Sequence, residues 1–273
     1  IEGKAKINFD TSGKIKDNYE IIGSIFNFNA KILKKFNINQ TDAEFELLKN
    51  NYSVYLIKGN INDINLANSK FEINKENKNF NVKGNLVSKA NLKNIQNTLD
   101  LFQINLLEGK VDKSEISFDL KSSLSFQLER YIKVKNLTIN GGGKIHFLNI
   151  QHRINTAKLK ETFTNYNDSF QITDTEIKFS SDSNKQNVEL KGLINLTNEY
   201  ENFQSKVIID KKKNNTHFDV KININSSIIK LPNLNYKKEI NDQASLKFKG
   251  SRKKNEGYNF EVIEFKESNN LIL

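Results

Sequence analysis

The sequence predicts a mainly β protein built on an elongated, curled antiparallel sheet, a repeating β-groove, with one or two short helices. The main observation is an alternation of apolar and polar residues with the two-residue period of a strand that buries one face. In Asn187–Thr197 the residues Val188, Leu190, Ile194 and Leu196 share one phase. Such clean alternation favours antiparallel strands with one apolar and one hydrated face. The low apolar content, 37% of 273 residues, and strand patterns along the whole chain favour an elongated sheet.

Glycine provides the second observation. Gly192 lies in the apolar phase of its strand, two residues after Leu190. The same apolar-x-Gly step recurs, so that seven of the twelve glycines follow it: Gly3, Gly23, Gly59, Gly84, Gly141, Gly192 and Gly250. Glycine inside a strand costs stability and usually marks a bulge, a bend or a close approach of backbone. Repeated on the apolar face, it predicts a sheet that curls.

The first third of the chain contains short strand patterns followed by one helical pattern. The expected strands are one near Ala5–Phe9, two within Tyr19–Ile38, one carrying Asp42, Glu44 and Glu46, and others around Tyr52–Ile61, Phe71–Ile73 and Phe80–Leu86. Apolar residues then recur every three or four positions within Asn91–Leu107. This spacing predicts an amphipathic helix, which Asn91 caps and Gly109 follows.

The longest alternation comes next, and it fits either one long strand or two strands that meet at Ser122 and Ser123. Its apolar phase consists of Ile116, Phe118, Leu120, Leu124, Phe126 and Leu128. Further strands are expected at Tyr131–Ile139 and Lys144–Ile150, on either side of three glycines, and a second helical segment is expected over Thr156–Thr164. The remaining strands are expected near Phe170–Phe179, Val188–Leu196, Phe203–Ile209, Phe218–Ile224, Ala244–Phe248 and Tyr258–Phe265.

Composition limits the classes of function. The chain starts at Ile1 and stops within an apolar run, so we interpret 1–273 as a single β-groove fragment of a larger protein, with a candidate sub-boundary near 91–108. The formal charge is +10, but lysine greatly exceeds arginine and there are 43 asparagines, which is typical of an AT-rich genome. The densest basic runs fall between strand patterns, where turns are expected, so nucleic-acid binding is not predicted. A weak attraction to anionic lipid headgroups is compatible with this charge.

No residue pattern points to catalysis, to a metal or to a cofactor. His146 and His152 are separated by six residues of strand, about 20 Å, and His217 stands alone. Gly141–Lys144 lacks the spacing of a phosphate-binding loop. Glu44 and Glu46 at strand spacing are interpreted as solvated charges, and there is no cysteine. The sequence therefore predicts a protein that is not an enzyme.

Several stretches resemble the large AsmA-like envelope proteins of Gram-negative bacteria, particularly the YhdP-type branch. The stretches are LKGLINLTNEYENF (Leu190–Phe203), FDVKININSSIIK (Phe218–Lys230), FKG (Phe248–Gly250), YNFEVIEFKESNN (Tyr258–Asn270) and the strand-then-helix unit VKGNLVSKANLKNI (Val82–Ile95). The resemblance implies a β-groove in the periplasm, anchored in the inner membrane by a segment outside this fragment. It also implies transport of phospholipid between the inner and outer membranes, as part of outer-membrane biogenesis.

Together, the alternation and the resemblance predict an apolar lane for lipid tails on one face of the sheet. The residues expected to line it are Phe118, Leu120, Leu124, Phe126, Val188, Leu190, Ile194, Phe218, Val220, Ile222 and Phe248. The alternative is that the same residues fill a closed core, as in a structural or adhesive β-rich envelope protein. Val220→Asp combined with Ile222→Asp is expected to block lipid passage from an open lane and to unfold a closed core.

Overall fold

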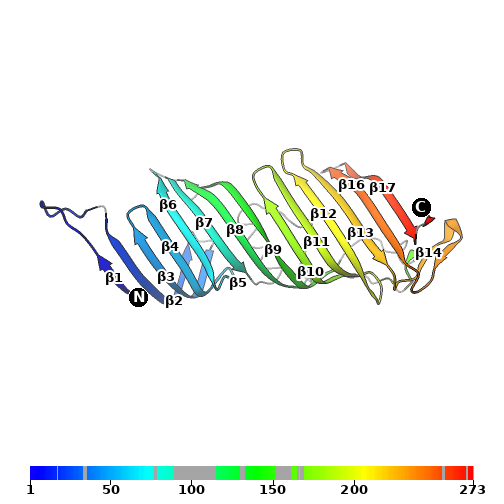
Figure 1. Ribbon diagram of the computed structural model, residues 1–273, viewed down its shortest axis with the longest axis horizontal. Coiled ribbons are helices and arrows are strands. Elements are labelled where there is room, and N and C mark those ends of the chain that lie inside the picture. Colours follow the sequence, from blue (N-terminus) through cyan, green and yellow to red (C-terminus); the bar gives the residue numbers. More distant parts are fainter. Residues whose placement is uncertain are drawn as a thin grey trace. The chain divides into compact units, whose positions relative to one another are not determined.

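The computed structural model describes residues 1–16, 18–32, 36–76, 79–88, 115–129, 133–151, 161–164, 166, 169–253, 256–268 and 270–272. It confirms the predicted mainly β fold with a large antiparallel sheet. Sixteen strands form this sheet, which is not closed, and two further strands, β14 and β15, pair with each other (Figure 1).

The strands follow one another in chain order within the large sheet, except that β5 pairs beside β4 and that β13 pairs directly with β16. The bounds are β1 (Glu2–Lys6), β2 (Glu20–Ile32), β3 (Phe36–Leu48), β4 (Asn51–Ile61), β5 (Ile64–Asn65), β6 (Ser69–Glu76), β7 (Asn79–Ser88), β8 (Glu115–Glu129), β9 (Lys133–Gln151), β10 (Ser169–Ser181), β11 (Lys185–Asn195), β12 (Tyr200–Asp210), β13 (Asn215–Ile224), β14 (Ile229–Leu231), the 3-10 turn η2 (Pro232–Leu234), β15 (Tyr236–Lys238), β16 (Ala244–Lys253), β17 (Gly257–Glu267) and β18 (Asn270–Leu271).

The chain divides into two compact units. Unit 1 consists of Ile1–Glu108 and Asp119–Gly141, and unit 2 of Gly109–Phe118 and Gly142–Leu273. The division therefore falls within strands β8 and β9. The candidate sub-boundary near 91–108 lies outside the described residues.

Two of the ambiguous sequence patterns are resolved as single long strands. The alternation around Ser122 and Ser123 is one strand, β8, and the glycines 141–143, which were expected to separate two strands, lie within one strand, β9. The first strand is Glu2–Lys6, earlier than the predicted Ala5–Phe9. The predicted helix Asn91–Leu107 lies outside the described residues. So does most of Thr156–Thr164, of which Glu161 and Thr162 are helical.

Cross-strand register collects the apolar residues of unit 1 on one face of its sheet. One row joins Ile21, Leu47, Tyr52, Ile73, Val82 and Phe126, which pair with one another in that order. In β8 the apolar phase is buried or half-buried, whereas Ser117, Asp119, Lys121, Ser123 and Ser125 are exposed. Because residues directly opposite in a ladder share a face, the predicted alternation describes β8 correctly.

Four of the glycine steps face a phenylalanine on the neighbouring strand. The cross-strand pairs are Gly23–Phe45, Gly84–Phe71, Gly192–Phe203 and Gly250–Phe218. A Cβ added to Gly23 would lie 2.5 Å from Cζ of Phe45, and one added to Gly250 would lie 2.9 Å from Cζ of Phe218. Gly23, Gly84 and Gly250 therefore make room for an aromatic ring, whereas a Cβ at Gly192 would meet Thr175 of the other neighbouring strand.

Two β-bulges shift the phase of the alternation in unit 2. In β10 the register shifts between Thr173 and Glu176, so Ile172 pairs with Ile194 and Ile177 pairs with Leu190. In β17 the shift lies opposite Lys249 and Gly250, so Phe260 and Ile263 both fall on the apolar face. A bulge adds one residue to one strand, so the alternation changes phase after it. Ile172 and Ile177 therefore lie on the same face although they are five residues apart, and so do Phe260 and Ile263, three residues apart.

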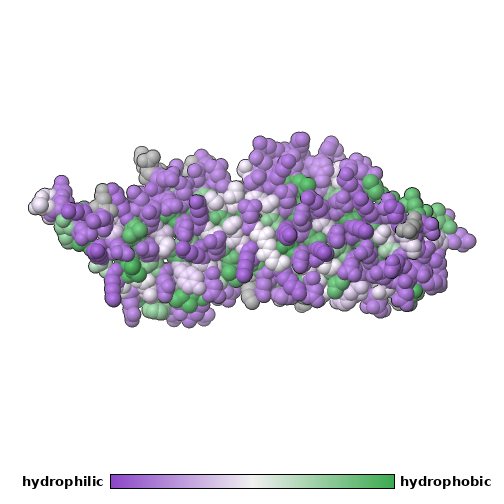
Figure 2. All heavy atoms as spheres, viewed as in Figure 1, coloured by the Kyte–Doolittle hydropathy of each residue, from purple (hydrophilic) through white to green (hydrophobic). Residues whose placement is uncertain are grey.

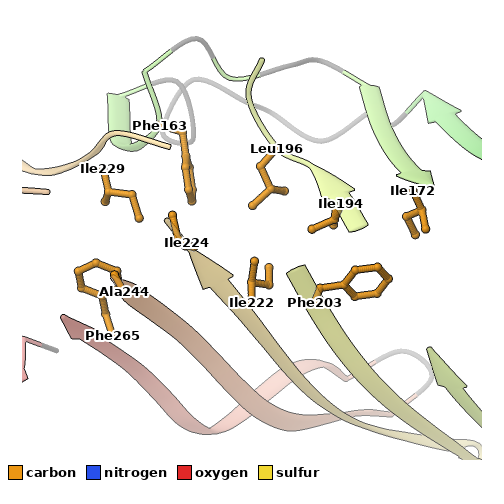
Figure 3. Close-up of a cluster of buried hydrophobic side chains, with 10 residues drawn as sticks. All are labelled: Phe163, Ile172, Ile194, Leu196, Phe203, Ile222, Ile224, Ile229, Ala244 and Phe265. Carbon is orange, nitrogen blue, oxygen red and sulfur yellow. The ribbon is translucent and has the colours of Figure 1, made fainter. Parts of the chain in front are cut away.

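The larger core cluster closes one end of the apolar face in unit 2. In Figure 3, Phe163, Leu196 and Ile229 point toward side chains from β12, β13, β16 and β17. Its buried members are Phe163, Ile172, Ile194, Leu196, Phe203, Ile222, Ile224, Ile229, Ala244 and Phe265. A smaller cluster in unit 1 consists of Ala43, Leu56 and Leu66.

We expect Gly250→Ala to lower the stability of unit 2 by about 1–3 kcal/mol, because the new methyl group would meet the ring of Phe218 and the backbone carbonyl of Asn259. The urea midpoint of the purified chain measures this loss. Ser251→Ala, one residue along the same strand and on the opposite face, is the control and should change the midpoint little. Equal midpoints for Gly250→Ala and the wild type would show that the phenylalanine does not need the space.

Candidate functional site

The sheet of unit 2 has one apolar face, which is built from rows of side chains that run across the strands. The first row is Phe179, Val188, Val207, Phe218, Gly250 and Phe260, and the second is Ile177, Leu190, Ser205, Val220, Phe248 and Ile263. A third row contains Gly192, Phe203, Ile222, Leu246 and Phe265. We call this surface of unit 2 the apolar face.

The opposite face of the same strands carries charged side chains in register. Lys178, Glu189, Lys206, Asp219 and Lys249 form one row across five strands, and Lys206 pairs with Glu189 at 2.8 Å. Lys191, Lys221 and Lys247 also lie on this face. Hydrophilic residues predominate on the side of the molecule turned to the viewer in Figure 2. The two faces of the sheet in unit 2 are therefore chemically distinct, because strand side chains alternate between them.

The predicted lane residues of unit 2 fall on the apolar face but in two different settings. Ile194 and Ile222 are 3% and 5% exposed and belong to the closed core. Leu190, Val220 and Phe248 are partly buried and pack against that core. Val188 and Phe218 are half-buried in the first row, away from the core. The predicted set thus spans a transition from closed core to open surface.

The other predicted residues lie on β8. Leu120, Leu124 and Phe126 belong to unit 1, where all three are half-buried and face Ser88, Gly84 and Val82 of β7, respectively. Phe118 belongs to unit 2 and is 5% exposed. The apolar phase of β8 is therefore brought together with that of β7.

A cap closes one end of the apolar face. It consists of β14, η2 and β15, which lie between β13 and β16 in the chain and form a separate two-stranded sheet. Ile229 of β14 is 2% exposed and bridges to Phe163, and Tyr236 of β15 packs edge-on against Phe265 at 5.7 Å. Burial and the nearby Glu267 carboxylate raise the pKa of Tyr236 to about 12.

Two buried charged side chains hold the loop that leads into the cap. The Glu201 carboxylate accepts hydrogen bonds from the backbone amides of Asn225, Ser226 and Ser227 at 2.7–2.9 Å. Nζ of Lys238, fully buried, donates to the carbonyl oxygens of Asn225, Ser227 and Glu239 at 2.8–3.1 Å. Burial lowers the pKa of Lys238, and the charge of Glu201 opposes that shift. Both charges are compensated by backbone groups, as buried charges require.

The other end of the apolar face is open and aromatic. Phe218 contacts Phe248, Tyr258 and Phe260 edge-on, with ring centroids 5.7–6.3 Å apart. Tyr258 is 65% exposed, Phe260 49% and Ile263 51%. The Arg252 guanidinium lies 5.3 Å from the centre of the Tyr258 ring, within the range of a cation–π contact. Large apolar side chains this exposed, and clustered, mark a surface that another molecule can cover.

Tyr258, Phe260, Ile263 and Arg252 were not among the residues expected to line the lane. The signal was present, since Tyr258 and Phe260 share one phase and Ile263 and Phe265 share the other. Only the bulge in β17 reconciles the two phases, and a bulge is not evident from alternation alone.

The described candidates for catalysis, phosphate binding or metal binding lie in ion pairs or on exposed strand positions. Lys144, after the three glycines, pairs with Asp174 at 2.8 Å. Glu44 is exposed and faces Tyr55, His146 and His217 are exposed, and His152 lies outside the described residues. Among the residues that the structure describes, no group of three acidic or histidine side chains could hold a metal ion. That part of the chain also has no helix of the length and apolarity needed to cross a bilayer.

Comparison with known proteins finds no matching family model, no similar curated protein and no similar solved structure.

We expect Glu201→Gln to destabilise the cap by about 1–3 kcal/mol. The amide that replaces one carboxylate oxygen donates rather than accepts, so buried backbone N–H groups lose their partner. The fall in urea midpoint measures this cost. Glu199→Gln, an exposed position on the same segment, is the control. An unchanged midpoint for Glu201→Gln would mean that the loop does not depend on the carboxylate.

Proposed function

We propose that this protein is a non-enzymatic lipid-transfer module whose apolar face holds the acyl chains of phospholipid. The observation that carries the proposal is the open part of the apolar face, where Phe260, Ile263 and Tyr258 are 49–65% exposed beside Phe218. An acyl chain needs a continuous apolar surface and no catalytic group. Its transfer from water to such a surface is favourable by about 0.8 kcal/mol for each buried CH2.

The charged opposite face supports the same function. A sheet that carries lipid on one side must remain hydrated on the other, and rows of lysine and glutamate provide this. In an antiparallel sheet with one apolar face, the residues that would contact lipid and those that would contact water alternate along every strand. Movement of phospholipid between the inner and outer membranes of a Gram-negative envelope belongs to this proposal, as the use that the AsmA-like resemblance implies.

The closed core supports the second candidate, a structural or adhesive β-rich envelope protein. Ile222 lies in this core, so a carboxylate there would be buried without a partner and is expected to unfold unit 2 under either function. Val220→Asp with Ile222→Asp therefore does not separate the two candidates. Substitutions at exposed positions of the apolar face do so, because they leave the core intact.

The discriminating variant is Phe260→Ser with Ile263→Ser. We expect phospholipid to co-purify with the wild-type chain prepared without detergent from a bacterial envelope, and the variant to retain about a tenth or less of it. Removing two apolar contacts of roughly 1.5–3 kcal/mol each accounts for this loss. Mass spectrometry of the extracted lipid measures the stoichiometry, and urea unfolding checks that the fold is kept.

The matched control is Ile208→Ser with Val262→Ser. Both residues are half-buried and lie on the charged face, where they pair with His217 and Lys249, respectively. This variant should retain the wild-type amount of phospholipid. A compact wild-type chain with no bound lipid would overturn the lipid-transfer proposal and favour the structural one.

A further inference from the structure

A basic rim borders the open end of the apolar face in unit 2. Three turns lie on this edge of the sheet, because they connect β10 to β11, β12 to β13 and β16 to β17, and these strands are antiparallel neighbours. We define the basic rim by its six described cations: Lys185, Lys211, Lys212, Lys213, Arg252 and Lys253. The first two turns are joined, since the amide of Lys211 donates to the carbonyl of Asn184 at 2.8 Å.

Three carboxylates on the same edge are engaged by the turns themselves. Asp182 accepts from the amides of Asn184 and Lys185, and Asp210 accepts from those of Lys212 and Lys213, at 2.6–3.1 Å. These bonds hold the pKa of both carboxyl groups below the usual value. Glu256 pairs with Lys253 at 2.9 Å. The described part of this edge therefore carries six positive and three negative charges, and the negative ones are directed at backbone amides or at Lys253.

Arg252 connects the rim to the apolar face. It lies two residues from Gly250 on the same face of β16, opposite Thr216 and Tyr258. Its guanidinium rests over the Tyr258 ring, and that ring contacts Phe218 at 6.2 Å. A cationic group with several donors thus stands about 7 Å, two strand residues, beyond the first apolar row.

The apolar face, from its first row to the core row at the cap, is about as long as one acyl chain. The apolar face extends from the row of Phe218 to the row of Ile222, four residues or about 14 Å along the strand. Each leaflet contributes about 15 Å to the hydrocarbon thickness of a bilayer. A chain that begins at the first row and lies along the strands would therefore reach the side chains of the closed core, with its headgroup at the basic rim.

We propose that the basic rim binds the phosphate of an anionic phospholipid whose acyl chains lie on the apolar face, so that unit 2 selects lipids by headgroup charge. This inference rests on the proposed lipid-transfer function and adds the class of lipid and its orientation. Charge complementarity supports it: the cap end is closed by Ile229 and Phe163, whereas the rim end offers an excess of cations next to exposed aromatic side chains.

The test compares the binding of fluorescent phosphatidylglycerol and phosphatidylcholine with identical acyl chains to the purified chain at low salt. We expect the wild type to bind phosphatidylglycerol about tenfold or more tightly, since a lysine or arginine near an anionic lipid surface contributes about fivefold. The rim variant combines Lys185→Gln, Lys212→Gln, Lys213→Gln and Arg252→Gln. It should lose the preference and bind both lipids equally, because the rim then no longer distinguishes the net charge of the headgroup.

A matched variant removes the same number of charges from the opposite face: Lys178→Gln, Lys191→Gln, Lys221→Gln and Lys247→Gln. It should keep the wild-type preference for phosphatidylglycerol. An equal loss of preference in both variants would show that the overall charge of the chain, rather than the basic rim, determines the preference for phosphatidylglycerol. Equal binding of the two lipids by the wild type would overturn headgroup selection alone, whereas failure to bind either lipid would overturn the lipid-transfer function. Displacement of phosphatidylglycerol by inorganic phosphate alone would make the rim a site for free phosphate instead.

Discussion

Cross-strand register is the constraint on which the other features of this protein depend. The register determines which side chains each apolar residue of the sheet in unit 2 contacts on the neighbouring strands, as in the row that joins Val188, Val207 and Phe218. Because the side-chain period is two, a slip of one residue would place lysines such as Lys206 and Lys221 on the apolar side. The glycine–phenylalanine pairs oppose such a slip, since a ring that fits over Gly250 meets a side chain at either neighbouring position.

The sequence predicted the faces of the regular strands but not the places where the alternation changes phase. In β8 and β13 every expected apolar residue lies on the expected face, because nothing interrupts the period. In β10 and β17 one extra residue shifts the phase, and alternation alone cannot separate a bulge from the end of a strand. The position of Glu201 could be predicted, since it lies two residues before Phe203 and therefore shares the apolar phase of its strand. Its partners lie 24–26 residues away in a loop and could not be found from spacing.

One apolar face thus serves two purposes in unit 2. Where the cap covers it, side chains such as Ile224 and Phe265 are almost completely buried and stabilise the fold. Beyond the cap, the same rows continue into half-exposed side chains, so the sheet exposes apolar surface without losing its core. The sequence did not distinguish these two regions, because burial depends on the cap and the cap comes from a short segment with little alternation. Tertiary packing, rather than local pattern, decides which residues are covered.

The cap has a further consequence for the energy landscape of the chain. Because β13 pairs directly with β16, the intervening residues 225–243 can detach without breaking a hydrogen bond between those two strands. The cap is therefore suited to open as a separate cooperative unit, with a free energy lower than that of global unfolding. Its backbone amides would then exchange with solvent through this partial opening, while those of β12 and β13 would exchange only when the sheet itself separates. Such an opening would uncover Ile222 and Ile224 and lengthen the apolar face for a time, with the strand register unchanged.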